Sequence, residues 1–211
     1  MTTRLSLYGG ALRLLGQRKL ASLTENTPAR HYLDDAWNGG ALDYCLESGQ
    51  WKFAMRSVML TYSPSVAPDF GYTYAFDKPT DHLRLGGVFG SPGMTADDAL
   101  LEYREEAGFW FANLDTIYVR YVSNDAAFGA DMSLWPASFT KFVEAHLASE
   151  IAMSLTNDEG KLGNMLTMRD KRFLPEALSR DAMQDPPKFA PMSGWTRARM
   201  GGGRIRGEGP H

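Results

Sequence analysis

The residues able to carry nucleophilic chemistry are few, because the chain has one cysteine, Cys45, and four histidines. A thiolate nucleophile needs a neighbouring base and a third group that orients the base. Cys45 falls on the apolar stripe of a predicted helix, where a thiol packs as a small hydrophobic side chain. We therefore expect Cys45 to be a core residue. A single cysteine also excludes an internal disulfide and a multi-cysteine zinc site, and it suits a reducing compartment.

The histidines His31, His82, His146 and His211 are spaced too far apart to form a metal pair on one helix. His146 adjoins the apolar ladder of a predicted helix, so we expect a hydrogen-bonded histidine in the core or at an interface. The glycine-rich segment 86–90 has neither the Lys-Ser/Thr of a phosphate-binding loop nor the spacing of a dinucleotide site. The sequence predicts no metal site and no cofactor.

Adjacent carboxylates occur at three places, Asp34-Asp35, Asp97-Asp98 and Glu105-Glu106. Neighbouring residues point to different faces of a helix or strand, so neither member can converge with the other on one reacting atom. We expect these pairs to lie on solvated faces, and we predict no catalytic residue.

Length and composition limit the elements that must position these side chains. The 211 residues (23.4 kDa) are 44% hydrophobic and 22% charged with a net charge of −3, which fits one domain or one domain with an insertion. The chain is neither broadly disordered nor a basic nucleic-acid binder. It has no run of 18 apolar residues, and its first residues lack the apolar core of a signal peptide.

Helical spacing marks the first part of the chain. Leu5, Tyr8, Leu12 and Leu15 predict a helix that ends at Gly16, with a kink or a close backbone approach at Gly9-Gly10. A second helix is expected from Thr27-Pro28 to Gly49, capped by Thr27, with Cys45 on its apolar stripe. A short third helix is expected to carry Trp51, Ala54, Met55, Val58 and Met59.

Alternating aromatic and β-branched residues then favour strands at 70–76, 83–89, 101–105, 108–112 and 116–122. The last two are predicted to form a hairpin, with Ile117, Val119 and Tyr121 on one face of the final strand. Helix returns after Pro136, where Phe139, Val143, Leu147, Ile151 and Leu155 form an i+4 ladder. A further helix is expected over about 158–183, bent or interrupted at Pro175.

This order predicts an α+β fold, a mostly helical bundle interrupted by an antiparallel β insertion and followed by an extended C-terminal arm. We assign residues 1–62 and 127–185 to the helical body, 63–126 to the β insertion and 186–211 to the arm.

The C-terminal arm differs from the rest in composition. Ten of its 26 residues are Gly or Pro, and five basic residues against Glu208 give it a charge of +4, which leaves −7 on the remainder. Apolar anchors and arginines in such a segment indicate docking on a partner rather than a core of its own. The residues that we predict to make this contact are Phe189, Met192, Trp195, Arg197, Arg199, Arg204, Ile205 and Arg206.

The order of motifs resembles the tail tubular protein A family of short-tailed phages, and more broadly the head-to-tail adaptors of tailed phages. The matching stretches, Ala11–Leu60, Tyr74–Leu85, Glu102–Asp125 and Trp135–Thr156, cover about half of the chain. They include a Trp-x-Phe-Ala start at Trp51 and a Pro-x-Asp-x-Leu-Arg turn at Pro79, Asp81, Leu83 and Arg84.

The resemblance implies a structural virion protein of the tail or neck, assembled in the host cytoplasm, that forms a ring, expected to hold twelve copies, below the portal. Such a ring connects the capsid to the tail and lines the DNA channel. Its implied partners are the portal protein, which the C-terminal arm contacts, the tail nozzle protein and possible tail fibres. Double-stranded DNA would pass through without specific binding, and no membrane is involved.

Two other functions stay open on the sequence. The arginine-rich arm would also suit a small nucleic-acid-binding protein, whose affinity would be weak and would fall steeply with salt. A cell-surface glycan hydrolase would need Cys45 or a carboxylate pair such as Asp34-Asp35.

Overall fold

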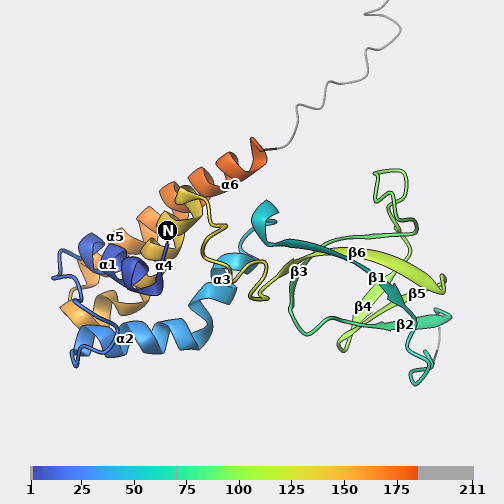
Figure 1. Ribbon diagram of the computed structural model, residues 1–211, viewed down its shortest axis with the longest axis horizontal. Coiled ribbons are helices and arrows are strands. Elements are labelled where there is room, and N and C mark those ends of the chain that lie inside the picture. The colour runs from blue at the N-terminus through green and yellow to red at the C-terminus, as the bar shows by residue number, and fades with distance from the viewer. Residues whose placement is uncertain (1, 70, 185–211) are drawn as a thin grey trace, which may run out of the picture.

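Two hydrophobic clusters organise the chain, one among the helices and the other between two small sheets. The computed structural model describes residues 2–69 and 71–184. It confirms the α+β class, with helices and antiparallel sheets. The helices gather at one end of an elongated molecule and the sheets at the other (Figure 1). The C-terminal arm, 186–211, lies outside the described residues.

The first helix, α1 (Arg4–Leu14), confirms the prediction from apolar spacing. Thr3 and Ser6 form a capping box at its start, and Gly16 adopts a positive φ of 71° just beyond its end. The helix is unbroken, so the expected kink at Gly9-Gly10 is absent. Gly10 instead faces the carboxylate of Glu144 on helix α4 (Ala137–Thr156), and the close approach is made by a side chain rather than by backbone.

The second predicted helix is divided. It consists of α2 (Pro28–Ala36), a π-helical turn (Trp37–Ala41) and α3 (Leu42–Glu47). The break falls at Gly40, whose φ of 96° is not helical, because two consecutive glycines lower the cost of leaving the helix. Thr27 occupies the N-cap as predicted, but its side chain makes no capping hydrogen bond.

The helix after Pro136 forms the centre of the helical end. It is α4 (Ala137–Thr156), which contacts α1, α2, α5 and α6. The last predicted helix is interrupted as expected, into α5 (Glu159–Met168), a π-helical turn (Arg169–Phe173) and α6 (Leu174–Ala182). The π turn ends just before Pro175, whose ring would clash with the carbonyl four residues earlier in a regular helix. Within the described ranges, no helix combines the length and apolar character needed to span a membrane.

The predicted third helix is wrong. A single 3₁₀ turn (Lys52–Ala54) leads directly into strand β1 (Met55–Thr61), so the sheet begins inside the segment that we assigned to the helical body. Burial alternates along the strand, with Val58 and Leu60 partly buried and Met59 exposed between them, and pairing with β6 over the whole strand outweighs the helical spacing. The first sheet has the order β1-β6-β3, with β3 (His82–Phe89) and β6 (Thr116–Ser123) antiparallel.

The second sheet has the order β2-β5-β4, formed by β2 (Tyr74–Asp77), β5 (Phe109–Ala112) and β4 (Arg104–Glu106). The predicted hairpin between the last two strands is therefore wrong, because β5 and β6 belong to different sheets. The prediction that Ile117, Val119 and Tyr121 share one face of β6 is confirmed, and that face is fully buried between the sheets.

Candidate interaction surfaces and the junction between helices and sheets

Trp51 anchors the first strand in the helical core. Its indole is 1% exposed, donates to the Cys45 carbonyl oxygen at 2.9 Å and lies edge-on to Phe139 of α4, with 4.9 Å between ring centroids. Phe53 packs on the same Phe139 ring at 4.8 Å, and Ala54 is fully buried. The Trp-x-Phe-Ala segment therefore fixes the start of β1 against the longest helix.

Asp81 holds the turn before β3. Its carboxylate accepts hydrogen bonds from Tyr121 at 3.1 Å and from the Ser123 hydroxyl, and it pairs with Arg56 of β1 at 2.9 Å. Partial burial raises the pKa of Asp81, but the donors Ser123, Arg56 and Tyr121 outweigh burial and hold it below its usual value. Burial and the neighbouring Asp81 raise the pKa of Tyr121 to about 12. A charged carboxylate thus joins all three strands of the first sheet.

Two further contacts tie the sheet to the helices. Arg84 of β3 donates to the Glu47 carbonyl oxygen at the end of α3, at 2.8 Å. Asp181 of α6 accepts from the Lys52 backbone N–H at 3.0 Å, and the Lys52 ammonium donates to the Asp181 carbonyl oxygen at 2.7 Å. The motifs at Trp51 and Asp81, separate in sequence, meet here in one junction between the helical end and the first sheet.

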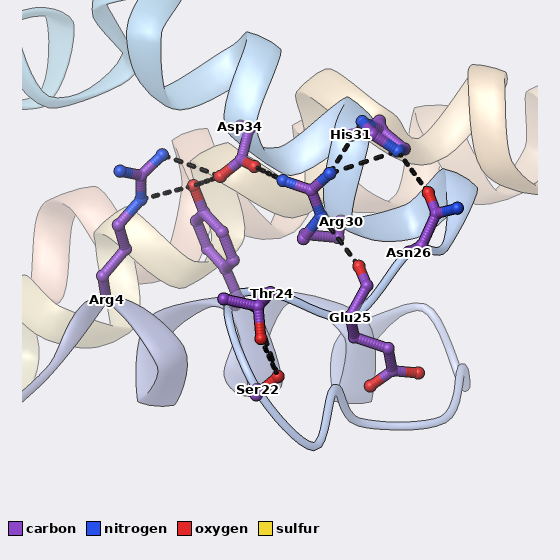
Figure 2. A network of polar contacts seen from close by, with 9 residues as sticks. Arg4, Ser22, Thr24, Glu25, Asn26, Arg30, His31 and Asp34 are labelled. Carbon is purple, nitrogen blue, oxygen red and sulfur yellow. Dashed lines mark hydrogen bonds and ion pairs between the residues drawn. The ribbon is translucent and has the colours of Figure 1, made fainter.

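Asp34 corrects the expectation that the paired carboxylates are all solvated. Figure 2 shows its carboxylate between Arg4 and Arg30. Asp34 pairs with Arg4 at 2.8 Å and with Arg30 at 2.5 Å, and its side chain is 23% exposed. Tyr8 also donates to it at 2.9 Å. Burial, together with Asp34, raises the pKa of Tyr8 to about 12, although Arg4 acts to lower it. The network pins α1 to α2, which is a structural role. Asp35 beside it is exposed, as expected.

The loop between α1 and α2 is fastened to the same network. Arg30 donates to the Glu25 carbonyl oxygen at 2.8 Å, and His31 contacts Asn26 at 3.0 Å (Figure 2). Arg18 pairs with the Glu25 carboxylate. The other carboxylate pairs are held locally, Glu105 by Lys78, Glu106 by Arg104 and Asp98 by Thr95.

Cys45 is fully buried, as predicted, and burial raises the pKa of its thiol well above the usual value. His146 is 4% exposed and stacks on Tyr44 with 4.4 Å between ring centroids, beside Arg169 at 3.4 Å. Burial and then the Arg169 charge lower the pKa of His146 to about 4, so the imidazole is neutral at pH 7. Among the residues that the structure describes, no hydrogen bond joins Cys45 to a histidine.

His146 lines a cavity of about 360 Å³ with Tyr44, Glu150, Arg169 and the Gly39-Gly40 turn. A Cβ at either glycine would project into open space. Over residues 2–69 and 71–184, no cluster of three or more His, Cys, Asp or Glu side chains is arranged to hold a metal ion.

The residues predicted to contact the portal, from Phe189 to Arg206, all lie outside the described residues. The sequence did not indicate that the junction residues come together. Trp51, Phe53 and Arg84 lie in the two motifs described above, whereas Asp181 lies in neither. No family model matches this chain, and no curated protein matches it.

Proposed function

We propose that this protein is a structural head-to-tail adaptor of a tailed phage. Copies of the chain form a ring, of about twelve subunits in the resembling family, beneath the portal and above the tail nozzle. DNA passes through the ring without being bound specifically. The C-terminal arm, outside the described residues, reaches the portal.

The observation that carries this proposal is the meeting of the two resembling motifs at one junction. Trp51 and Phe53 belong to one motif, and Asp81 and Arg84 to the other. Trp51, Phe53 and Arg84 fix the first sheet to the helices, and Asp81 joins the strands of that sheet. A ring subunit needs such a joint, because helices that pack side by side must hold the sheets at a constant angle. The four motif residues have structural roles in packing and hydrogen bonding, which is consistent with an adaptor.

Charge supports the same proposal. Residues before the arm carry a net charge of −7, and double-stranded DNA has a high density of negative charge. Like charge disfavours adhesion, so an acidic ring lets DNA slide. The arm, at +4, is suited to an acidic patch on a protein partner.

Co-sedimentation with the portal ring encoded by the same genome tests the proposal. The full chain should bind stoichiometrically, and a chain cut before Pro186 should fold, by circular dichroism, without binding. The paired variant Arg197→Ala/Arg199→Ala should weaken binding. The control Lys171→Ala/Arg172→Ala, which removes the same charge from the exposed turn before α6, should not. A full chain that does not bind the portal refutes the adaptor. Retention on DNA that falls steeply with salt would then favour the nucleic-acid-binding alternative.

A further inference from the structure

Strand β1 forms one edge of the first sheet and pairs on one side only, with β6. Its register with β6 runs without a bulge from Met55 to Thr61. Ser57, Met59 and Thr61 have exposed side chains, and Met59 is 61% exposed. The strand therefore presents a regular edge to solvent.

One hydrogen bond fixes which backbone groups point outward. Tyr62 donates its N–H to the Asp115 carbonyl oxygen at 3.2 Å, just past the end of the β1–β6 ladder. Residues of an antiparallel pair alternate between facing the partner strand and facing away from it. The N–H and C=O groups of Ser57, Met59 and Thr61 consequently point away from β6.

The free edge extends two residues to either side of Met59, because the next outward-facing residues, Met55 and Ser63, donate their N–H groups within the chain. The Met55 N–H is taken by the Lys52 carbonyl oxygen, and the Ser63 N–H donates to the Ala75 carbonyl oxygen at 2.7 Å. Within the described residues, the outward backbone groups of Ser57, Met59 and Thr61 make no backbone hydrogen bond. Met59 is the midpoint of the free edge.

Natural sheets protect such edges with lysine, proline, bulges or covering segments. The opposite edge of the same sheet is protected, since β3 has two register shifts and Leu100 donates to the Val88 carbonyl oxygen at 2.9 Å. The outward residues of β1 are uncharged, and the strand contains no proline. The free edge is consequently suited to adding a strand.

The sequence of the edge matches itself in reverse. Ser57-Val58-Met59-Leu60-Thr61 reads polar, apolar, Met, apolar, polar in either direction. An antiparallel pairing centred on Met59 places Ser57 opposite Thr61 of a second copy and Val58 opposite its Leu60. Val58 and Leu60 pack on the core between the sheets, so the pairing would extend that apolar face.

We propose that a second copy of this chain docks on β1 through a two-fold antiparallel contact centred on Met59. About six backbone hydrogen bonds form, because three residues on each copy contribute one donor and one acceptor. A two-fold contact turns the two copies in opposite directions, whereas all subunits of the proposed ring face the same way. The contact therefore belongs to the chain before assembly and is separate from the ring interface.

Light scattering on the full chain, over a range of concentrations, measures this association. The wild type should reach about twice its monomer mass of 23.4 kDa. Met59→Lys should stay monomeric, because a lysine pair at the centre repels and edge lysines block strand addition. Leu101→Lys removes a side chain that is 89% exposed elsewhere and should still dimerise.

Cross-linking gives a second measurement that does not depend on Met59→Lys folding. Hydrogen-bonded antiparallel partners have Cα atoms about 5.5 Å apart, within the range that a disulfide spans. Met59→Cys should oxidise to a disulfide-linked dimer at least about tenfold faster than Leu101→Cys, because only the former holds its own copy at this distance.

A wild-type chain that stays monomeric overturns the inference, as does equal cross-linking of the two cysteine variants. Larger oligomers unaffected by Met59→Lys also overturn it, while leaving the adaptor proposal standing. If the full chain forms the Met59-dependent dimer but does not bind the portal, the adaptor proposal fails and the dimer inference stands.

Discussion

Replacing Asp81 should destabilise the first sheet, because its one carboxylate accepts hydrogen bonds from three donors on two strands. Asp81→Ala leaves the hydroxyls of Tyr121 and Ser123, both fully buried residues, without their acceptor. Each unsatisfied buried group costs about 1–3 kcal/mol. The pair with Arg56, whose side chain is 36% exposed, adds less than about 1 kcal/mol. We expect a total loss of about 3–5 kcal/mol in the free energy of unfolding, and a fall in Tm of roughly 10 °C.

Urea unfolding followed by tryptophan fluorescence and far-UV circular dichroism measures this loss, and coincident curves from the two probes establish two-state behaviour. Asp81→Asn should lose about half as much, since it keeps one acceptor oxygen. Asp35→Ala, at an exposed carboxylate on α2, is the matched control and should change stability by less than about 0.5 kcal/mol. A loss below 1 kcal/mol for Asp81→Ala would refute the reasoning.

The same carboxylate predicts a pH dependence. The folded pKa of Asp81 lies below its usual value, so the unfolded chain takes up the proton first. The contribution is fully present above about pH 4 and is lost as the pH falls through the folded pKa. The stability difference between wild type and Asp81→Asn should therefore shrink below about pH 4.

Two further predictions concern the free energy of unfolding, one for alanine substitutions at two glycines and one for the titration of His146. A Cβ at Gly129 would lie 2.1 Å from the Ser123 carbonyl oxygen, so Gly129→Ala should lower the free energy of unfolding by about 2 kcal/mol or more. Gly163→Ala, in open space on α5, should raise it by up to about 1 kcal/mol. Equal effects of the two variants in urea unfolding would contradict the packing at Gly129. The pKa of His146 is about 4 when folded and near 6.5 when unfolded, so stability should fall by up to about 3 kcal/mol as the pH drops from 6.5 to 4. His146→Phe should flatten this profile and the exposed His31→Gln should not; NMR titration of His146 near pH 6.5 would refute it.

Most helices and most strands could be predicted from the sequence, because their signals are local. The Thr3 cap, the Gly16 stop and the i+4 ladder of Phe139 act within a few residues of the element that they define. The buried position of Cys45 and the shared face of Ile117, Val119 and Tyr121 followed from periodicity alone. Charge asymmetry between the arm and the rest is likewise a property of composition.

The errors occurred where a distant partner decides the outcome. Met55 to Met59 fits a helix or a strand, and only pairing with β6 selects the strand. The strands β5 and β6 are separated by a short turn, yet each finds better apolar partners in its own sheet. The sequence around Asp34 predicted a solvated carboxylate, because its partners Arg4 and Tyr8 lie on α1, far from it in the sequence.

The sequence by itself determined most of the helices and strands, their apolar faces and the buried setting of Cys45, because these depend on neighbours a few residues apart. The tertiary structure alone decided the junction, in which Trp51, Arg84 and Asp181 join the first sheet to the helices from distant segments. It also decided which edge of the first sheet is left open. Both depend on how strands pair across long sequence separations, and no local pattern encodes which strand becomes the neighbour of which.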